Sequence, residues 1–598
     1  MSIREEFPYE IRMQDVSFSY SVDEENSVKA VEGLSFSVEK GEYIALLGRN
    51  GSGKSSVAKL INVLEFPDDG RVYVMGYLST EQSTFWEIRE NCGMVFQNPD
   101  NQIVGTTVEE DVAFGPENLG IPSEEIRRRV DEALTYVGLE AMALRQPSAL
   151  SGGQKQRLAI AGILAMQPRI MILDESTSML DPGGREDFLA LVERLIEEKG
   201  ITVVHITHDM NEAARADRLI VLSEGKVALE GTPAEVFSQR DVLRELDLDV
   251  PIYAELLYSL AAVTGVSVAS EDIVSREVAL DRICEILGSG VVCSPELPEA
   301  FEGEAEALFC SGTPILEVKN LSHVYDTESE PSIADISFEV YEGECLAVIG
   351  QSGSGKTTLI THLNGLLRPQ KGEVLLRQDG KLFSIENKKD IRVIRSHVGL
   401  LFQYPEYQLF EETVEKDVGF GPKMMGLPPD VVKERVIRAL ELVGLDESFL
   451  ARSPFGISGG QKRRVAFAGI LAMEPDVLVL DEPAAGLDPA GRREIFSYIR
   501  ELKRRKKTVI LVSHNMDEAV SCCDRVLVLE SGKGYGPWSP DALFADSGRL
   551  ADLGVRCPEL VSCLWRIRES FPTLNPRQYS MDDAVRELLS LLVRRKAE

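Results

Sequence analysis

The sequence predicts an α/β fold, built twice in one chain, each time around a parallel sheet. Short apolar runs at Tyr43–Leu47 and Ile170–Leu173, and a less continuous one at Ile201–Ile206, have the length of strands that are buried on both faces. The helix expected after the first run carries apolar residues at i, i+3, i+4 and i+7, namely Val57, Leu60, Ile61 and Leu64. Buried strands that alternate with helices are typical of a parallel sheet covered by helices.

An internal repeat is the second observation behind this fold class. Gly48–Ser55 (Gly-Arg-Asn-Gly-Ser-Gly-Lys-Ser) returns as Gly350–Thr357 (Gly-Gln-Ser-Gly-Ser-Gly-Lys-Thr), and Ser151–Arg157 returns as Ser458–Arg464. The segments after Gly231 and after Pro540 have helical patterns, and their sequences match weakly. A sequence repeated at this length indicates two copies of one structural unit.

The predicted organisation is a domain with a small helical appendage, an acidic linker, and then the same pair again. The linker holds two prolines and five glutamates, which favour an exposed segment. An irregular end of the first unit is the alternative for this stretch. The predicted boundaries are 1–235, 236–293, 294–313, 314–542 and 543–598.

Composition restricts the class of protein. The 598 residues carry a net charge of −33, which argues against a large nucleic-acid surface, so no nucleic-acid partner is expected. No apolar run approaches the roughly 20 residues that span a bilayer, and residues 1–6 lack the core of a signal peptide. The nine cysteines include no Cys-x-x-Cys pair and are expected to be free thiols, and the six histidines form no evident metal cluster. We expect a protein of the cytoplasm or of a membrane surface.

The Gly48–Ser55 segment follows a predicted buried strand and opens a predicted helix, which is the context of a P-loop. Its glycines let backbone amides surround phosphates, Lys54 can pair with the β- and γ-phosphate oxygens, and Ser55 can bind Mg²⁺. Two such segments in matching context predict two sites for ATP. The residues expected to contact nucleotide or its Mg²⁺ here are Gly48, Asn50, Gly51, Gly53, Lys54, Ser55, Ser56, Gly350, Ser352, Gly353, Gly355, Lys356, Thr357 and Thr358.

Two adjacent carboxylates end a predicted strand in each unit, Asp174-Glu175 in the first and Asp481-Glu482 in the second. An aspartate at this place can hold Mg²⁺ through its water shell, and the glutamate beside it can polarise an attacking water. Polar residues that merely end a strand are the alternative. The predicted metal ligands are Ser55, Asp174, Thr357 and Asp481.

Further candidates lie near other predicted strand ends. His208 and His514 each follow an apolar run, where an imidazole can bond a γ-phosphate and orient the catalytic water. Tyr20 and Tyr325 precede the two P-loops at similar spacing and are candidates for stacking on adenine. Phe18 competes with Tyr20 for that role, and a tyrosine of the core is the alternative.

The segment Ser151-Gly152-Gly153-Gln154 and its repeat at Ser458–Gln461 complete a recognisable order of motifs. A serine and two glycines open the backbone, and the residues that follow favour the first turn of a helix, whose free amides suit an anion. With the P-loops, Gln97 and Gln403, the paired carboxylates and the histidines, the chain resembles the ATP-binding cassette (ABC) ATPases, twice over.

This resemblance implies two P-loop NTPase domains in tandem, each with a helical signature subdomain, that pair head to tail within the chain. One ATP would then lie among Lys54, Asp174 and the other first-unit residues and be completed by Ser458 and Gly460; the other would lie at Lys356 and be completed by Ser151 and Gly153. The implied catalytic residues are Glu175, Glu482, His208, His514, Gln97 and Gln403. Because both glutamates are present, we predict two hydrolytic sites.

The stretches after the two glutamines resemble the energy-coupling factor (ECF) transporter ATPases. They are residues 98–103 with 108–118, and 404–409 with 414–422. The resemblance implies an ATPase on the cytoplasmic face of the cell membrane that powers uptake of a vitamin or transition-metal ion. Its partners would be a transmembrane scaffold (T) subunit and a substrate-binding (S) subunit. A groove lined by Asp100, Glu109, Glu110 and Asp111 would suit a basic helix end of the scaffold, and a solvated acidic surface is the alternative.

A tandem-cassette translation factor that acts on the ribosome is the second candidate function. It would also hold two cassettes without a membrane span. The acidic charge and the lack of a long basic helical linker weigh against it. A DNA-repair cassette ATPase would need a long coiled-coil insertion, which the sequence lacks.

Overall fold

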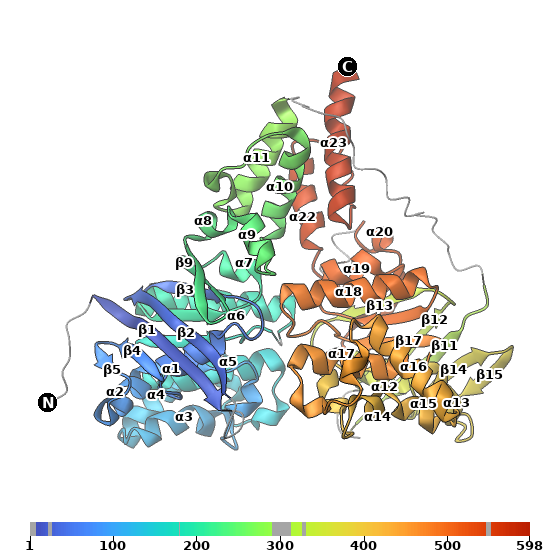
Figure 1. Cartoon of the computed structure of the whole chain (residues 1–598), viewed down its shortest axis with the longest axis horizontal. Coiled ribbons are helices and arrows are strands. Elements are labelled where there is room, and N and C mark those ends of the chain that lie inside the picture. Colours follow the sequence, from blue (N-terminus) through green and yellow to red (C-terminus); the bar gives the residue numbers. More distant parts are fainter. Residues whose placement is uncertain are drawn as a thin grey trace. The chain divides into compact units, whose positions relative to one another are not determined.

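The computed structural model describes residues 8–21, 27–178, 180–289, 312–325, 331–545, 550 and 552–597. These residues divide into two compact units, one for each repeat of the sequence, and Figure 1 labels their elements. The linker predicted at 294–313 lies almost wholly outside the described residues. In the described part of the chain, no helix combines the length and apolar character needed to cross a membrane.

A six-stranded sheet forms the centre of the first unit, in the order β10-β9-β3-β8-β7-β6. All neighbours are parallel except β9 and β10. Every residue of β3 and β8 is buried, which explains their apolar sequences. The predicted parallel sheet is therefore confirmed. The strands are β3 (Tyr43–Leu47), β6 (Cys92–Val95), β7 (Ile170–Asp174), β8 (Thr202–Ile206), β9 (Arg218–Ser223) and β10 (Lys226–Gly231).

A second, antiparallel sheet was not foreseen. It has the order β2-β1-β4-β5, with β1 (Tyr9–Ser21), β2 (Ser27–Glu39), β4 (Asp69–Val74) and β5 (Tyr77–Leu78). Its inward side chains, such as Ile11 and Val72, share one core with Leu46 of β3 and with Leu60 of α1 (Lys54–Ile61). The helix that follows the P-loop is thus held within the main core of the unit.

The remaining helices of the first unit include a helical subdomain of α3, α4 and α5, which pack on one another. Local sequence explains their ends: Thr107 and Glu110 form a capping box at the start of α3, and Gly138 ends α4 in the left-handed conformation. The helices are α2 (Phe85–Asn91), α3 (Val108–Asn118), α4 (Ser123–Val137), α5 (Gly152–Met166), α6 (Pro182–Lys199) and α7 (Met210–Ala213).

The second unit repeats both sheets. The larger has the order β16-β17-β18-β13-β19-β20 and the smaller β12-β11-β14-β15. The strands are β11 (Leu316–His323), β12 (Ile333–Val340), β13 (Cys345–Gly350), β14 (Lys371–Gln378), β15 (Lys381–Ser384), β16 (Val398–Leu401), β17 (Val477–Asp481), β18 (Thr508–Val512), β19 (Arg525–Glu530) and β20 (Lys533–Trp538).

The helices of the second unit follow the same order with one difference. The counterpart of α3 is divided at Gly419 into α14 and α15. The helices are α12 (Lys356–Leu363), α13 (Ile391–His397), α14 (Val414–Val418), α15 (Phe420–Met424), α16 (Pro429–Leu442), α17 (Gly459–Leu471), α18 (Pro489–Arg504) and α19 (Met516–Cys522).

The segments after Gly231 and Pro540 are helical, as their patterns predicted. The weak repeat between them is structural, because Pro251 and Pro558 are the N-cap residues of α10 and α22. The helices are α8 (Pro233–Phe237), α9 (Arg240–Glu245), α10 (Ile252–Thr264), α11 (Arg276–Ser289), α20 (Pro540–Leu543), α22 (Glu559–Arg568) and α23 (Met581–Ala597).

One detail of the helix prediction was wrong. Helix α1 ends at Ile61, so Leu64 lies beyond it and its side chain is 44% exposed. The chain leaves the helix at Asn62, whose side chain donates to the carbonyl oxygen of Cys92. The apolar spacing that predicted one face of a helix therefore extends beyond the end of the helix itself.

Candidate functional site

The predicted site residues converge because four neighbouring parallel strands end at one edge of the sheet. In the first unit β3 leads into the P-loop, β7 ends at Asp174, β8 is followed by His208, and β6 is followed by Gln97. The carboxyl edge of a parallel sheet is where such folds place ligands. The second unit has the same arrangement around β13, β17, β18 and β16.

The first P-loop is shaped by glycines at positions with positive φ. A Cβ on Gly48 (φ 149°) would lie 2.3 Å from the carbonyl oxygen of Leu222, and one on Gly53 (φ 102°) 2.4 Å from that of Ala30. A Cβ on Gly51 would meet nothing within 4 Å, and Asn50 is also exposed. The loop is therefore closely packed on its inner side and open on its outer side.

Lysine side chains lie across both loops. Lys54 Nζ donates to the carbonyl oxygens of Gly48 (2.7 Å) and Arg49 (2.9 Å), and Lys356 Nζ donates to those of Gly350 (2.8 Å) and Gln351 (2.9 Å). Burial lowers the pKa of Lys54, although nearby Glu175 opposes the shift. The second loop repeats the glycine geometry at Gly350, Gly353 and Gly355, with Ser352 exposed beside them.

The predicted metal ligands lie together in each unit. Ser55 Oγ donates to Asp174 Oδ1 at 3.1 Å, and Thr357 Oγ1 donates to Asp481 Oδ2 at 3.3 Å. Burial and the neighbouring glutamate raise the pKa of each aspartate to about 6. A buried carboxylate next to a second one gains from a nearby cation.

These residues fit ATP with Mg²⁺. The N-cap residue of α1 is a glycine without a capping side chain, so the first-turn amides face the open side of the loop, where phosphates bind. The hydroxyl and carboxylate oxygens are the hard ligands that Mg²⁺ prefers. Both observations hold equally for α12 in the second unit.

Glu175 is the centre of a polar group in the first unit. Gln97 Nε2 donates to Glu175 Oε2 at 2.9 Å, and His208 Nε2 lies 2.6 Å from Glu175 Oε1. In the second unit Gln403 Nε2 donates to Glu482 Oε2 at 2.9 Å, and His514 Nδ1 lies 3.2 Å from the same oxygen. The structure thus brings together all six predicted catalytic residues, three in each unit.

The two glutamates are held in an uncommon backbone conformation. Glu175 has φ 48° and Glu482 has φ 47°, in the left-handed region, and their amides donate to Ile206 and Val512 of the next strand. Burial raises the pKa of both carboxyls, but contact with the histidines and the P-loop lysines outweighs it, so the net shift is downward. Each glutamate is therefore ionised and can accept a hydrogen bond from water.

The two candidate adenine-stacking tyrosines differ in exposure. Tyr325 is 64% exposed, and its hydroxyl lies 3.2 Å from Thr358 Oγ1. Tyr20 is partly buried, stands edge-on to Phe18, and accepts from Ser56 Oγ at 3.4 Å. An open ring face is needed for stacking, and Tyr325 offers it more fully than Tyr20 does.

The predicted signature segments begin helices α5 and α17. Ser151 Oγ accepts from Gln154 N, while Gln154 Oε1 accepts from Ser151 N at 2.9 Å, which is a capping box. Ser458 and Gln461 repeat it. A Cβ on Gly460 would meet nothing within 4 Å, and one on Gly153 only Leu180 Cδ2 at 3.7 Å. Contact of these residues with a nucleotide stays a prediction.

Comparison with known proteins places this geometry in a family. A family model described as "ABC transporter" matches residues 31–178 and 333–485. A protein of Caldanaerobacter subterraneus subsp. tengcongensis is 34% identical over 570 residues, covering 94% of this chain and 97% of that protein. Its name describes it as an ABC transporter ATP-binding protein. The chain belongs to the ABC transporter family of ATP-binding proteins. Its two units are ABC cassettes, which are ATPase domains that bind ATP.

Other relatives match one cassette length. The energy-coupling factor transporter ATP-binding protein EcfA1 of Clostridioides difficile is 49% identical over 276 residues, 46% of this chain and 99% of that protein. A solved structure of cbiO1 from Clostridium perfringens, described as part of the ABC transporter complex cbiONQ, is 35% identical and covers 42% of this chain and 100% of that chain, with a TM-score of 0.37.

Two residues of the signature helices were missed by the sequence analysis. Gln156 is fully buried and its Nε2 donates to the carbonyl oxygen of Gln97 at 3.3 Å. Arg463, at the same place in the second cassette, donates to the carbonyl oxygen of Gln403 at 3.3 Å. Each ties its signature helix to the catalytic glutamine. The sequence signal available was that Gln156 and Arg463 occupy the same position in the two repeats, although they are different residue types.

A buried carboxylate below the histidine loop was also missed. Glu212 Oε2 accepts from Thr207 Oγ1 at 2.5 Å and from Thr177 Oγ1 at 3.0 Å, joining the loop after β8 to the turn after Glu175. Burial raises its pKa to about 7. Glu518 recurs at this place in the second cassette, where it is mostly buried and burial raises its pKa.

The four acidic residues predicted to line a groove after Gln97 all have partners within the first cassette. Asp100 is paired with Lys155 (2.6 Å), Glu109 with Arg127 (2.7 Å), and Glu110 belongs to the capping box of α3. Asp111 accepts from two amides of the preceding loop. The chain's own donors thus engage all four carboxylates, and binding of a basic helix end there stays a prediction.

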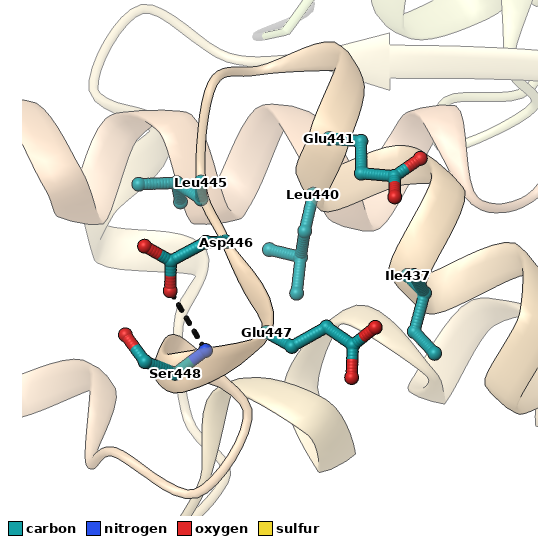
Figure 2. Close-up of a pocket in the computed structure, with 7 residues that line it drawn as sticks. All are labelled: Ile437, Leu440, Glu441, Leu445, Asp446, Glu447 and Ser448. Atoms are coloured by element: carbon teal, nitrogen blue, oxygen red, sulfur yellow. Dashed lines mark hydrogen bonds between the residues drawn. The ribbon is translucent and has the colours of Figure 1, made fainter.

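Figure 2 shows a pocket of about 450 Å³ in the helical subdomain of the second cassette. It lies at α16 and the short turn Glu447–Phe449, and Asp446 Oδ1 accepts from Ser448 N there. None of the predicted nucleotide-site residues lines it. The lining residues are Ile437, Leu440, Glu441, Leu445, Asp446, Glu447 and Ser448.

Proposed function

We propose that the chain is the ATP-hydrolysing energy-coupling subunit of an ECF-type importer, which powers uptake of a vitamin or a transition-metal ion. Similarity to EcfA1 over a full cassette length supports this class. The observation that carries the proposal is a matched pair of exposed apolar positions in the stretch that follows Gln97 in the first cassette and Gln403 in the second.

These positions are Val104 and Phe114 in the first cassette and Phe410 and Phe420 in the second. Phe114 is 50% exposed and Phe410 is 58% exposed. In the second cassette the rings of Phe410 and Phe420 meet edge to face, with centroids 4.9 Å apart, and exposed Met424 lies one turn beyond on α15. Exposed apolar side chains that recur at equivalent places suit a protein partner.

The loops that carry Val104 and Phe410 are held in place by equivalent aspartates. Asp111 Oδ1 accepts from the amides of Val104 (2.7 Å) and Gly105 (2.8 Å), and Asp417 Oδ2 accepts from those of Phe410 and Glu411 (both 2.9 Å). A preformed loop loses less conformational entropy on binding. An apolar helix of a scaffold subunit is the occupant that this surface suits, rather than a basic helix end.

The chemistry assigned to each site is ATP hydrolysis by positioning and charge. Backbone amides and Lys54 or Lys356 bind the phosphates; Ser55 with Asp174, or Thr357 with Asp481, would hold Mg²⁺. Bound Mg²⁺ neutralises the charge on the phosphate oxygens. Glu175 and Glu482 accept a proton from the attacking water, while Gln97, His208 and their counterparts orient it.

Head-to-tail pairing of the two cassettes is part of the proposal. The nucleotide at Lys54 would be completed by Ser458 and Gly460, and the one at Lys356 by Ser151 and Gly153. Pairing on ATP and separation after hydrolysis would supply the movement passed to the scaffold (T) subunit, and from it to the substrate-binding (S) subunit. Because both cassettes are on one chain, each has a high effective concentration near the other. The protein would act at the cytoplasmic face of the membrane.

Purification of the tagged full chain from detergent-solubilised membranes tests this proposal. We expect membrane subunits to copurify and the substrate-binding one to carry a small molecule that mass spectrometry identifies. Ribosomal proteins in place of membrane subunits would support the translation-factor alternative and contradict the proposal.

A matched pair of variants tests the surface itself. Phe410→Asp is expected to reduce recovery of the membrane subunits at least tenfold, because a charge would be buried on docking. Leu382→Asp is the control, since Leu382 on β15 is also exposed but lies outside this surface. Equal loss of recovery in both variants would contradict the assigned surface.

A further inference from the structure

Three cysteines come together in the core of the second cassette. Cys345 begins β13, Cys522 ends α19, and Cys523 follows it directly. Their sulfurs all lie within 4.8 Å of one another, with Cys345 Sγ 3.3 Å and Cys522 Sγ 4.0 Å from Cys523 Sγ. All three thiols are free, and none of the side chains is more than 6% exposed. Residues far apart in sequence thus form one buried group of three sulfurs.

The spacing of these sulfurs fits a single metal ion. A metal–sulfur bond of about 2.3 Å places three sulfurs about 4.0 Å apart around a trigonal ion and about 3.8 Å apart around a tetrahedral one. The sulfur–sulfur separations of 3.3 and 4.0 Å, with the third below 4.8 Å, are compatible with both values. Side-chain movements of less than about 1 Å would complete the site.

The surroundings favour a soft ion with three ligands over Zn²⁺. The group of possible ligands among the described residues contains these three sulfurs and no histidine or carboxylate. The nearby Asp524 carboxylate accepts from the Cys345 amide (2.9 Å) and from Lys503 Nζ (2.7 Å). Zn²⁺ takes four ligands in structural sites, and burial keeps water from supplying the fourth, whereas Cu(I) is a soft ion that thiolates select.

A lysine lies beside the sulfur group. Lys503 Nζ donates to the Cys522 carbonyl oxygen at 2.9 Å. The lysine would offset negative charge that remains when thiolates surround a monovalent ion.

The first cassette does not share this group. The residue at the place of Cys345 is Tyr43, whose hydroxyl lies 2.9 Å from Nδ1 of buried His205, and the residue before Asp217 is Ala216. Both cassettes hold the strand in the same way, since Asp217 accepts from the Tyr43 amide as Asp524 does from that of Cys345. The cysteines are therefore not needed to build this part of the fold.

We infer that Cys345, Cys522 and Cys523 form a binding site for one Cu(I) ion in the second cassette. Three sulfur–copper bonds form, and the protons of the bound thiols pass to solvent, with no change of oxidation state. The ion would join β13, the strand that leads into the P-loop, to α19, which follows His514 by two residues. Such a site would stabilise the base of the second nucleotide site.

Anaerobic titration of the phosphine-reduced full chain tests this inference. Cu(I) would be offered from a chromophoric chelator, and we expect the chain to withdraw one ion more than Cys523→Ala does. X-ray absorption at the copper edge is expected to show three sulfur neighbours. Cu(I) should also raise the unfolding temperature of the parent and not of Cys523→Ala, because an ion that binds only the folded state stabilises it.

Two controls separate the site from general thiol binding. Cys92→Ala removes a buried thiol of the first cassette and should withdraw as much Cu(I) as the parent. Cys345→Val, which suits a strand, should lose the same single ion as Cys523→Ala. Equal Cu(I) uptake by parent and both cluster variants would overturn the inference and leave the three cysteines as core packing. Binding of Zn²⁺ in preference to Cu(I) at these sulfurs would overturn the choice of ion.

Discussion

The side-chain amide of Gln156 donates a hydrogen bond of 3.3 Å to the backbone carbonyl oxygen of Gln97. Gln156 lies in α5, five residues after the N-cap Ser151, whereas Gln97 contacts Glu175. Arg463 makes the equivalent bond to Gln403. In each cassette the signature helix is thus connected through one side chain to the glutamine that we propose orients the water, and we expect movement of one to affect the other.

Removal of this connection should slow hydrolysis. Gln156→Leu keeps the volume but loses the donor, and a lost hydrogen bond of about 1 kcal/mol at a positioned group corresponds to a roughly fivefold lower kcat. The KM for ATP should stay unchanged, since Gln156 does not contact the P-loop. Steady-state kinetics measures both. Gln156→Arg, which copies the second cassette, should retain activity, and parental kcat in Gln156→Leu would contradict the coupling role.

We expect each cassette to contribute to the total rate of ATP hydrolysis. Glu175→Gln and Glu482→Gln keep the hydrogen-bonding shape but remove the proton acceptor, which is worth about 10²- to 10⁴-fold at one site. We expect each single variant to lose at least half of the ATPase rate and the double variant to lose about 100-fold or more. Phosphate release by the purified chain measures this. A single variant with the full rate would show that its site does not hydrolyse ATP.

The signature serines should act on the nucleotide of the opposite cassette. In a Glu175→Gln background only the Lys356 site turns over, and there Ser151→Asp should lower the rate at least tenfold. Aspartate is a good N-cap residue, so α5 is retained while its charge repels the γ-phosphate. In a Glu482→Gln background the same change should have little effect. The reverse pattern would contradict the crossed pairing, and Ser458→Asp is the mirror control.

The pH dependence of stability should change when Glu212 is replaced. Burial raises the folded pKa of Glu212 to about 7, above its unfolded value, so its contribution to stability is present at low pH and lost as pH rises towards 7. Asp209 adds to this shift and Arg185 opposes it. His205, whose pKa burial lowers to about 4, lies 3.5 Å from Glu212 Oε2 and is present in both proteins that are compared.

Glu212→Gln is therefore compared with the parent. The variant should gain stability over the parent between about pH 5 and pH 7, by a few kcal/mol at most. Urea unfolding at each pH measures the difference. A constant difference across this range would mean that Glu212 is not the titrating group.

The sequence was sufficient for the parallel sheets and for the catalytic groups, for one physical reason. Buried strands need continuous apolar runs, and polar residues directly after such runs must meet at the carboxyl edge of the sheet. Glu175 and His208 were found in this way. The antiparallel sheet was missed because β1 and β2 are half-exposed and carry bulges, which interrupt the alternation of residue types.

Contacts between distant residues that lie outside the strand ends and motifs could not be predicted. The link from Gln156 to Gln97 joins residues 59 positions apart, and the Cys345 group spans 178. The sequence did not indicate that acidic residues such as Asp100 and Glu109 form ion pairs within the chain. Their partners, Lys155 and Arg127, come beside them only when the helical subdomain folds.

Uptake into proteoliposomes tests the central claim most directly. The complex purified with the full chain would be reconstituted with ATP on the side of the cassettes, and accumulation of the copurified small molecule would be followed over time. The account predicts ATP-dependent accumulation that falls at least tenfold with the Glu175→Gln/Glu482→Gln chain. Undiminished accumulation with that double variant would contradict it.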